Sequence, residues 1–179
     1  MVTRTAAVLL MFIAGCTYGE EHASREDAAR AQEDAGIPLY WVGESFEGFP
    51  LTAAEVSGPR RALFVYGECD GESEGIDGFH CTKPQLQIQF LPFDAVGWKI
   101  ASGCRTVASL RGVPTLHHGG LVLVTRNGIV KAFGHNAAQS RRLALALRSL
   151  DGPSRQVLPP PSDEQRRIVA EACPGSIAH

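Results

Sequence analysis

Two apolar runs joined by an Asn-Gly pair, "LVLVTRNGIVKAF" at residues 121–133, constrain the fold more than any other part of this sequence. Asn and Gly both tolerate the positive φ angles of a two-residue turn, so the pair predicts a β-hairpin. A turn at Asn127-Gly128 would pair Val124 with Lys131. Both faces of this hairpin carry apolar side chains, so we expect it at the centre of a sheet or beneath a helix.

Three further segments have the composition of strands, with β-branched and aromatic residues bounded by glycine and proline. They are "LYWV" at 39–42, "ALFVY" at 62–66 and "LQIQF" at 86–90, with "LTAAEV" at 51–56 as a weaker candidate. In the third segment, Leu86, Ile88 and Phe90 alternate with glutamines, which predicts one buried and one solvated face. The stretch 67–84 lacks such a pattern, and we expect a long loop there.

A helix is expected directly after the hairpin. Asn136, followed three residues later by Gln139, has the form of a capping box. Leu143, Leu147 and Leu150 then repeat at i, i+4 and i+7, which predicts one buried helix face that continues to the Gly-Pro pair at 152–153. The residues expected to face solvent on this helix are Arg141, Arg142 and Arg148.

A second capping box, Ser162 with Gln165, predicts a helix over 163–172 with Val169 and Cys173 on its inner face. The Pro-rich link before it is expected to be extended. Together these elements predict a two-layer α+β domain. It would contain a mostly antiparallel sheet of five or six strands with one or two helices on one face.

The N-terminus combines Arg4 with an apolar stretch at residues 6–15. This stretch is too short for the bilayer core, which needs about 20 apolar residues. A basic start, a short apolar middle and small residues before a break are typical of a secretory signal. The final residues, Ile13-Ala14-Gly15-Cys16, resemble the lipobox of bacterial lipoproteins. This resemblance implies cleavage before Cys16, acylation of Cys16, and anchoring at the outer face of the cytoplasmic membrane.

An ordinary cleaved signal with a chance cysteine and a buried N-terminal helix are the alternatives to a lipobox. On the lipoprotein interpretation, residues 1–15 are the signal peptide and 16–36 are the lipidated cysteine with a polar tether. Ser24 could cap a helix within the tether and Gly36 could end it, but with no large apolar residue between Tyr18 and Ile37 such a helix would have little to pack on. Residues 37–151 then form the α+β domain, and 152–179 form the Pro-rich link and C-terminal helix.

Four cysteines follow Cys16, and an even number in an exported chain predicts two disulfides. They are Cys69, Cys81, Cys104 and Cys173. Three pairings are possible. Cys69–Cys81 is favoured because a short Gly-rich acidic loop joins the two residues. This pairing leaves Cys104–Cys173 to attach the C-terminal segment to the domain. A zinc site is the alternative, but no Cys-x-x-Cys pair occurs in the sequence.

The candidates for metal binding are weak. His117 and His118 are adjacent, and neighbouring side chains on a strand diverge instead of converging on one ion. The acidic loop at 68–77 invites a calcium interpretation, but its carboxylates lack the spacing of an EF-hand. We therefore expect no metal and no cofactor.

No catalytic residue is predicted, because the sequence contains no Ser-x-x-Lys pair and no phosphate-binding glycine loop. A net charge of −2 without a basic stripe argues against a nucleic-acid partner. Aromatic residues at a domain edge make good contacts, so the segment 40–52 provides a candidate contact surface. Its members are Tyr40, Trp41, Phe46 and Phe49, and the alternative is that they close the end of the core.

Residues 37–150 also resemble a group of hypothetical lipoproteins from high-GC Gram-positive bacteria. The similarity lies in "YWVGESFEGFPLT", "ALFVYGEC", "CTKPQLQIQ" and the hairpin with its helix, and it implies no activity. The expected function is a membrane-anchored, non-enzymatic binding or adaptor module with an envelope protein or a cell-wall component as partner. The alternative is an envelope enzyme or metal-dependent binding protein that uses the region of His117 and His118.

Overall fold

The computed structural model describes residues 22–69, 72–75, 78–81, 84–94, 105–152 and 158–173. Its helices are α1 (Arg25–Ala35), α3 (Ala137–Ala146) and α4 (Asp163–Ala172). Its strands are β1 (Tyr40–Trp41), β2 (Ser45–Phe46), β3 (Phe49–Gly58), β4 (Arg61–Cys69), β5 (Glu72–Gly75), β6 (Gly78–Cys81), β7 (Pro84–Leu91), β8 (Arg105–Leu110), β9 (Val113–His117), β10 (Leu121–Thr125), β11 (Gly128–Phe133) and β12 (Arg148–Ser149).

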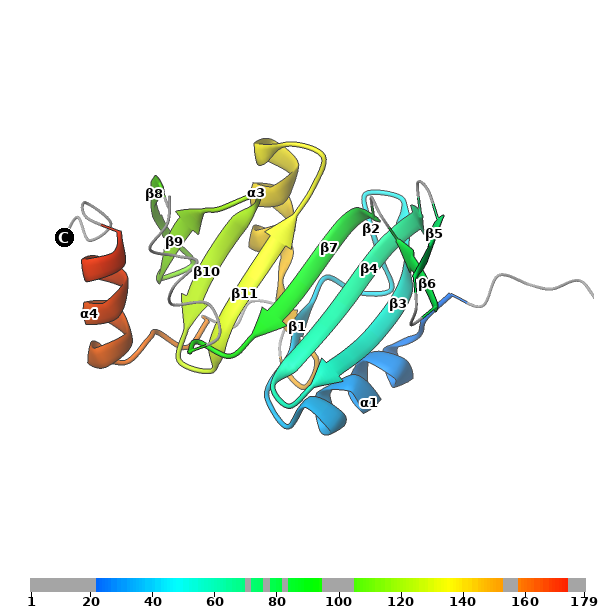
Figure 1. Cartoon of the computed structure of the whole chain (residues 1–179), viewed down its shortest axis with the longest axis horizontal. Helices are drawn as coiled ribbons and strands as arrows, with labels where there is room; N and C mark the ends of the chain where they lie inside the picture. The colour runs from blue at the N-terminus through cyan, green and yellow to red at the C-terminus, as the bar shows by residue number, and fades with distance from the viewer. Residues whose placement is uncertain are drawn as a thin grey trace, which may run out of the picture.

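Eight strands form one antiparallel sheet in the order β2-β3-β4-β7-β11-β10-β9-β8 (Figure 1). The order contains two meanders, one ending in β7 and one ending in β11, and the two meet through these last strands. Two-stranded pairs, β1-β12 and β5-β6, complete the described strands. The α+β class is therefore confirmed, whereas the predicted count of five or six strands is wrong for the main sheet.

The strands missing from the prediction include β8 and β9, which form a hairpin around Arg111-Gly112. Both turn residues have positive φ angles, 55° for Arg111 and 79° for Gly112. An Arg-Gly turn is a weaker sequence signal than Asn-Gly, because arginine rarely adopts positive φ. The hairpin consequently left no clear mark in the sequence.

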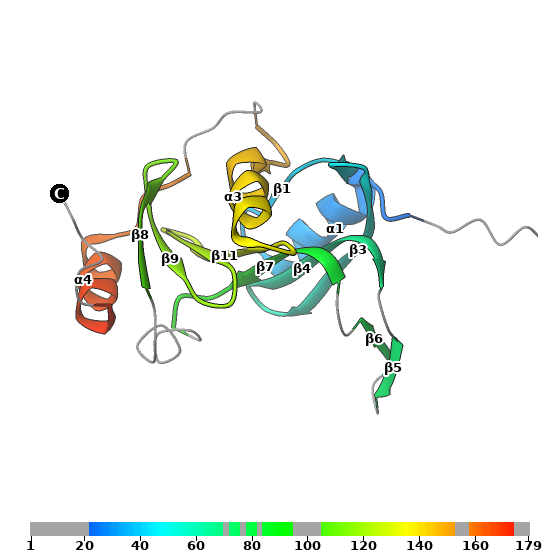
Figure 2. The same cartoon turned by 90° about the horizontal axis from the view of Figure 1, so that it is seen from above.

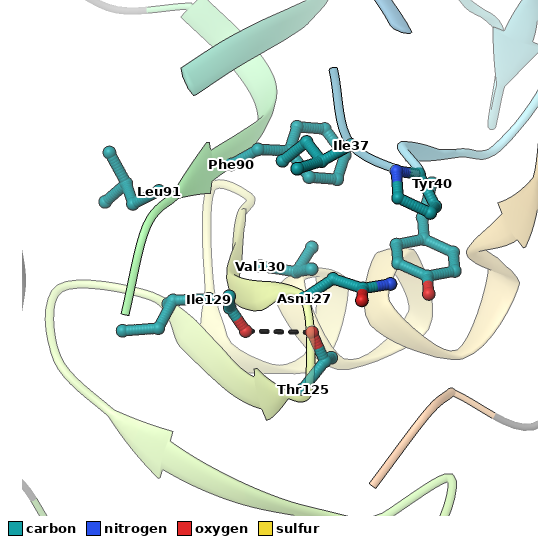
Figure 3. A pocket seen from close by; sticks show the side chains of 10 residues that line it. Ile37, Tyr40, Phe90, Leu91, Thr125, Asn127, Ile129 and Val130 are labelled. Atoms are coloured by element: carbon teal, nitrogen blue, oxygen red, sulfur yellow. Dashed lines mark hydrogen bonds between the residues drawn. The ribbon is translucent and has the colours of Figure 1, made fainter. Parts of the chain in front are cut away.

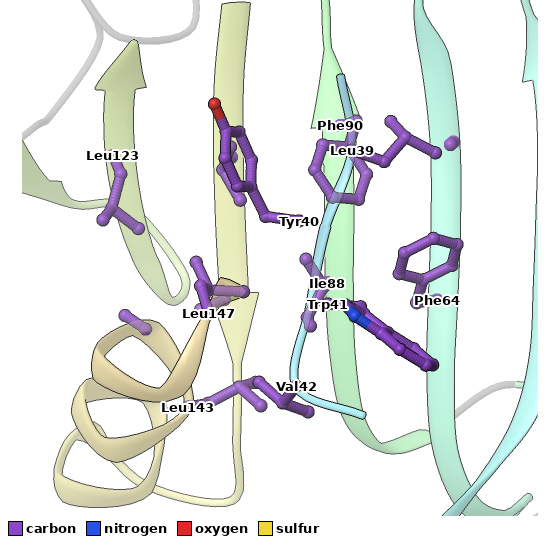
Figure 4. Packing of buried hydrophobic residues seen from close by; sticks show 14 of the residues in the cluster. Leu39, Tyr40, Trp41, Val42, Phe64, Ile88, Phe90, Leu123, Leu143 and Leu147 are labelled. Atoms are coloured by element: carbon purple, nitrogen blue, oxygen red, sulfur yellow. The ribbon is translucent and has the colours of Figure 1, made fainter. Parts of the chain in front are cut away.

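The main core lies on one face of the sheet, beneath α1, α3 and the β1-β12 ribbon. Figure 2 shows α1 and α3 on the same side of the sheet. The segment 39–42 lies on this face of the sheet between the two helices, and its side chains pack with residues of β4, β7 and α3 (Figure 4). Phe64 and Phe90 meet edge to face here, with ring centroids 5.6 Å apart. The segment 39–42 therefore belongs to one continuous core that spans both halves of the sheet.

Helix α1 packs into this core, although it has no large apolar side chain. Ser24 and Asp27 form a capping box at its start, and Gly36 ends it in the left-handed conformation. Ala28, Ala31 and Ala35 form the buried face and are at most 3% exposed. Small side chains let the helix backbone approach the sheet closely. The predicted tether over 16–36 is therefore too long, because the folded domain begins at α1.

The 121–133 hairpin forms as predicted, but its register differs. Thr125 pairs with Gly128 and Val124 with Ile129, so the turn is Arg126-Asn127. A Cβ atom on Gly128 would lie 2.5 Å from the carbonyl oxygen of Leu91, and the φ of Gly128 is +138°. Glycine is needed here for close approach of β11 to the end of β7, not for the turn itself.

Helix α3 begins as predicted, because the Asn136 side chain accepts a hydrogen bond from the backbone N–H of Gln139. It ends at Ala146, however, well before the predicted stop at 152–153. Leu143, Leu147 and Leu150 are all buried, but only the first lies in the helix. The chain extends after Leu147 so that Arg148 and Ser149 pair with β1. The expectation that Arg148 faces solvent on a helix is wrong.

The stretch 67–84, predicted as a long loop, contains a hairpin instead. Strand β4 continues to Cys69, and β5 and β6 pair with Glu72 opposite Cys81. Figure 2 shows this β5-β6 hairpin projecting from the side of the sheet opposite α1 and α3. Alternating glutamates and glycines gave no apolar period from which these strands could be predicted.

Helix α4 lies on the opposite face of the sheet from α1 and α3. Val169 and Cys173 pack against Leu116, Val122 and Val124, which alternate along their strands with residues of the main core. The helix has the predicted capping box at Ser162 and Gln165. The expectation of helices on one face is therefore incomplete. Among the described helices, none is long and apolar enough to cross a membrane.

Candidate functional site

A polar hollow of about 510 Å³ opens beside the β1-β12 ribbon. Its lining comes from three parts of the chain that are distant in sequence: the start of α1, the β1 segment and the β12 segment. The lining residues are Arg25, Trp41, Glu44, Arg148, Ser149, Leu150 and Gly152. The hollow forms because α3 ends at Ala146 and the chain that follows pairs with β1 as β12.

Arg148 and Trp41 are directly opposite each other in the β1-β12 pair. The guanidinium carbon of Arg148 lies 5.5 Å from the centroid of the Trp41 indole ring. A guanidinium over the face of a tryptophan is attracted by the electrons of the ring. The Trp41 side chain itself is buried, so it supports Arg148 from the core side.

Gly43 gives the guanidinium its space. A Cβ atom at this position would lie 2.5 Å from the Nη2 atom of Arg148, and the φ of Gly43 is +108°. Both observations favour glycine at residue 43. The bend after β1 therefore places the Arg148 guanidinium against bare backbone.

Arg148 has no carboxylate partner among the described residues, whereas four other described arginines make ion pairs. Its Nε atom is buried and has no hydrogen-bond partner in the described part of the chain. Leaving a buried donor without an acceptor costs about 1–3 kcal/mol. The guanidinium is therefore a positive group that is held in place without an anion.

The buried hydroxyl of Tyr66 lies close enough to Arg148 to be affected by its charge. Burial raises the pKa of Tyr66 to about 12, while the backbone N–H of Val42 and the positive charge of Arg148 act in the opposite direction. The Val42 N–H donates to the Tyr66 hydroxyl oxygen at 3.3 Å. Tyr66 is therefore neutral at ordinary pH, and it leaves the charge of Arg148 uncompensated.

The other charged groups of the hollow lie at the start of α1. The Arg25 guanidinium donates to the carbonyl oxygen of Leu150 at 3.3 Å, and the Arg25 backbone N–H donates to Glu44 Oε1 at 3.3 Å. Nearby, Gln32 donates to the Asp151 carboxylate at 2.6 Å. The lining thus contains two guanidinium groups and one carboxylate.

Two other hollows offer fewer groups that could bind a ligand. One, of about 490 Å³, is lined by His22, Ser24, Asp27 and β3, but Asp27 is already occupied by the capping box of α1. The other lies at the tip of the β10-β11 hairpin beside Tyr40 and holds only about 10 Å³ of free space (Figure 3). That space is at the lower limit for a single water molecule.

The structure corrects the predicted contact surface. Tyr40 and Trp41 are 6% and 5% exposed and belong to the core. Phe46 and Phe49 are partly buried and pack against the same core. These four residues mainly close the edge of the domain, as the alternative interpretation held. Trp41 also lines the hollow, where it contacts Arg148.

The histidines stay separate from the hollow. His117 ends β9 and His118 follows it, and both are half-buried. His135 is exposed and lies 6.5 Å from Phe49, measured between ring centroids. Within the described ranges, no group of three or more His, Cys, Asp or Glu side chains is close enough to hold a metal ion.

Two of the predicted covalent sites fall in parts that the structure does not describe, namely Cys16 and Cys104. Cys173 is 2% exposed and is disulfide-bonded. Cys69 and Cys81 lie on β4 and β6. The pairings Cys69–Cys81 and Cys104–Cys173 stay predictions.

Sequence reasoning missed Arg148 as a site residue. The leucine period over 143–150 placed it on the outer face of a helix, and only the pairing of β12 with β1 brings it over Trp41. Gly43, between Val42 and Glu44, was the one available signal, because a glycine directly after a strand-like segment can mark a close backbone approach.

Comparison of the chain with protein-family models, with curated proteins and with solved structures finds no match. The function must therefore be argued from the sequence and from the geometry of the hollow.

Proposed function

We propose that this chain is a lipid-anchored, extracytoplasmic binding module without enzymatic activity, held at the outer face of the cytoplasmic membrane through Cys16. Support comes from the basic start, the apolar stretch and the lipobox-like Ile13-Ala14-Gly15-Cys16. Two or three acyl chains anchor a protein stably, whereas a single chain is marginal. A partner in the envelope, either a protein or a cell-wall component, fits this location.

The lipobox-like end of the apolar stretch carries the proposal, and the short connection between Cys16 and the domain then sets where the domain would lie. Helix α1 begins at Arg25 and is packed into the core, so nine positions separate its first residue from the proposed anchor. A fully extended chain of that length spans about 30 Å, against about 70 Å for a tether that ended at residue 36. The domain would therefore stay close to the lipid surface.

The same connection gives the hollow a defined place. Arg25 is both the first residue of α1 and a lining residue of the hollow. A lipid on Cys16 would therefore hold the hollow near the membrane. Two guanidinium groups and an aromatic ring in one concave site are features of recognition, which supports a binding role.

The experiment is to express the full chain in a Gram-positive host and to measure the intact mass of the protein extracted from the membrane fraction in mild detergent. We expect loss of residues 1–15 together with the added mass of acyl chains. Cys16→Ser serves as the control and is expected in the soluble or secreted fraction. A wild-type chain that keeps residues 1–15 or carries no acyl mass would contradict the proposal.

A further inference from the structure

We infer that the hollow between α1 and the β1-β12 ribbon binds a ligand through an oxyanion, a carboxylate or a phosphate group, that pairs with the guanidinium of Arg148. This inference rests on the binding role proposed for the hollow but not on the lipid anchor. The defining residues are Arg148, Trp41, Ser149 and Arg25.

Arg148 itself is in a state that favours an anionic partner. It is half-buried, lacks an ion pair within the described ranges, and has a buried Nε without an acceptor. Elsewhere, Arg142 and Arg167 are exposed and still bind carboxylates. A guanidinium presents its N–H groups as a planar fork that matches the two oxygens of a carboxylate or phosphate. An oxyanion paired with the accessible part of the guanidinium would supply the missing negative charge.

The guanidinium of Arg148 is already held in place. Trp41 supports it on one side, and Gly43 leaves room for its Nη2 atom. A positioned side chain loses little conformational freedom when a ligand binds. The arrangement therefore favours one planar anionic group in one orientation over a diffuse attraction for anions.

The polar groups around Arg148 also suit a bound anion. The Ser149 Oγ accepts a hydrogen bond from the Asp151 backbone N–H at 3.3 Å, and its own hydroxyl proton can be donated to a ligand. Glu44 lies at the α1 side, where its carboxylate accepts from the Arg25 backbone N–H. Repulsion from Glu44 places the bound anion at the Arg148 and Ser149 end of the hollow.

The test uses the fluorescence of Trp41 in the full chain in nonionic detergent. Trp98→Phe removes the second tryptophan. Sodium phosphate and sodium acetate are titrated separately at constant ionic strength, with chloride as the replaced ion. We expect a saturable change in emission with either anion. Arg148→Gln should weaken binding by at least about tenfold. Arg141→Gln, on the exposed face of α3, should bind as the parent does.

A second arm identifies the source of the oxyanion. Vesicles of phosphatidylcholine alone are compared with vesicles that also contain phosphatidylglycerol. A response to soluble anions but not to the anionic vesicles supports a free ligand. A response to both supports a lipid headgroup as an accessible source. No response of Trp41 to phosphate, acetate or anionic vesicles would overturn the inference.

Circular dichroism and thermal melting check that each variant is folded. If Arg148→Gln does not fold, Arg148→Lys replaces it, because lysine keeps the charge but loses the two-point contact. A folded variant of either kind that binds both anions as tightly as the parent would overturn the role of the guanidinium. Soluble anions reach the hollow whether or not Cys16 is acylated, so failure of this test and failure of the membrane proposal are distinguishable.

Discussion

Arg148 lies over the indole ring of Trp41, its cross-strand partner, with the guanidinium carbon 5.5 Å from the ring centroid. The two residues come from short strands at opposite ends of the folded chain, and their pairing closes the ribbon above the core. A change at this contact is therefore expected to alter both the stability of the domain and the shape of its hollow.

Gly43→Ala is expected to push the Arg148 guanidinium away from Trp41, because the new Cβ would lie 2.5 Å from Nη2. Gly48→Ala is the matched control: its φ is +88° and no atom lies within 4 Å of its Cβ position. Both variants strain the backbone, but Gly43→Ala should lose about 1 kcal/mol more in unfolding free energy. Denaturant unfolding measures this difference. Equal losses of unfolding free energy in the two variants would contradict the prediction.

Gly128→Ala tests the close approach of β11 to β7. Its φ is +138°, and a Cβ would lie 2.5 Å from the carbonyl oxygen of Leu91. Gly58 has a similar φ of +145° with open space around its Cβ position, so Gly58→Ala carries the strain without the clash. We expect Gly128→Ala to cost at least about 1 kcal/mol more than Gly58→Ala in thermal or denaturant unfolding. Equal losses of unfolding free energy would mean that backbone strain alone, and not the clash with Leu91, favours glycine at residue 128.

Ala28→Leu should disrupt the packing of α1 on the sheet, because Ala28 lies on the inner face of the helix and is completely buried. Overpacking of this kind costs about 1–3 kcal/mol. Ala29→Leu, on the neighbouring half-buried position, should change the unfolding free energy much less. The two variants are compared by denaturant unfolding. If they are equally stable, α1 is not held to the sheet through its alanine face.

The ion pair between Glu47 and Arg142 predicts a pH dependence of stability. The hydrogen bond from Arg142, at 2.5 Å, is the main reason why the pKa of Glu47 is below its ordinary value of 4.5. A carboxyl whose pKa is depressed in the folded state stabilises the fold above its unfolded pKa. That contribution is lost as the pH falls through the folded pKa.

Glu47→Gln should therefore destabilise the domain at pH 7, and the difference from the parent should shrink towards pH 3. Denaturant unfolding at several pH values gives this profile. The control is the same substitution in an Arg142→Gln background, where most of the pH-dependent difference should disappear. A difference that stays constant from pH 7 to pH 3 would show that the charge of Glu47 is not responsible.

Cys173→Ser should remove a disulfide that stabilises the packing of α4, because Cys173 is buried and disulfide-bonded. We expect a loss of about 2–4 kcal/mol in unfolding free energy under oxidising conditions. If Cys104 is the partner, Cys104→Ser should cause the same loss, and the double variant should lose no more. Additive losses would assign Cys173 to another cysteine, and peptide mapping would identify it.

The parts of the fold that the sequence predicted well have a repeated apolar pattern. The alternation of Leu86, Ile88 and Phe90 and the capping box at Ser162 both appear in the structure. The packing of helix α1 into the core escaped prediction because its buried face is made of alanines, whose burial depends on the shape of the sheet rather than on their hydrophobicity. The strands β5 and β6 escaped for a related reason, since they carry no apolar period.

The candidate site was harder to predict than the fold. The spacing of the leucines around Arg148 predicts a helix at this position. Local helix propensity therefore competes there with the long-range pairing of β12 and β1. The pairing prevails in the structure, and no local pattern indicates it. A hollow assembled from Arg25, Trp41 and Arg148 is a property of the tertiary structure alone.

The meeting of the two meanders at β7 and β11 has a kinetic consequence. Each meander is built from neighbouring segments, so its hairpins can form early. The β7-β11 pairing joins segments that are distant in sequence and closes a long loop. Until it forms, both central strands have open edges that can pair with other chains. The protein is therefore most prone to misassembly during folding just before β7 and β11 pair at the centre of the sheet.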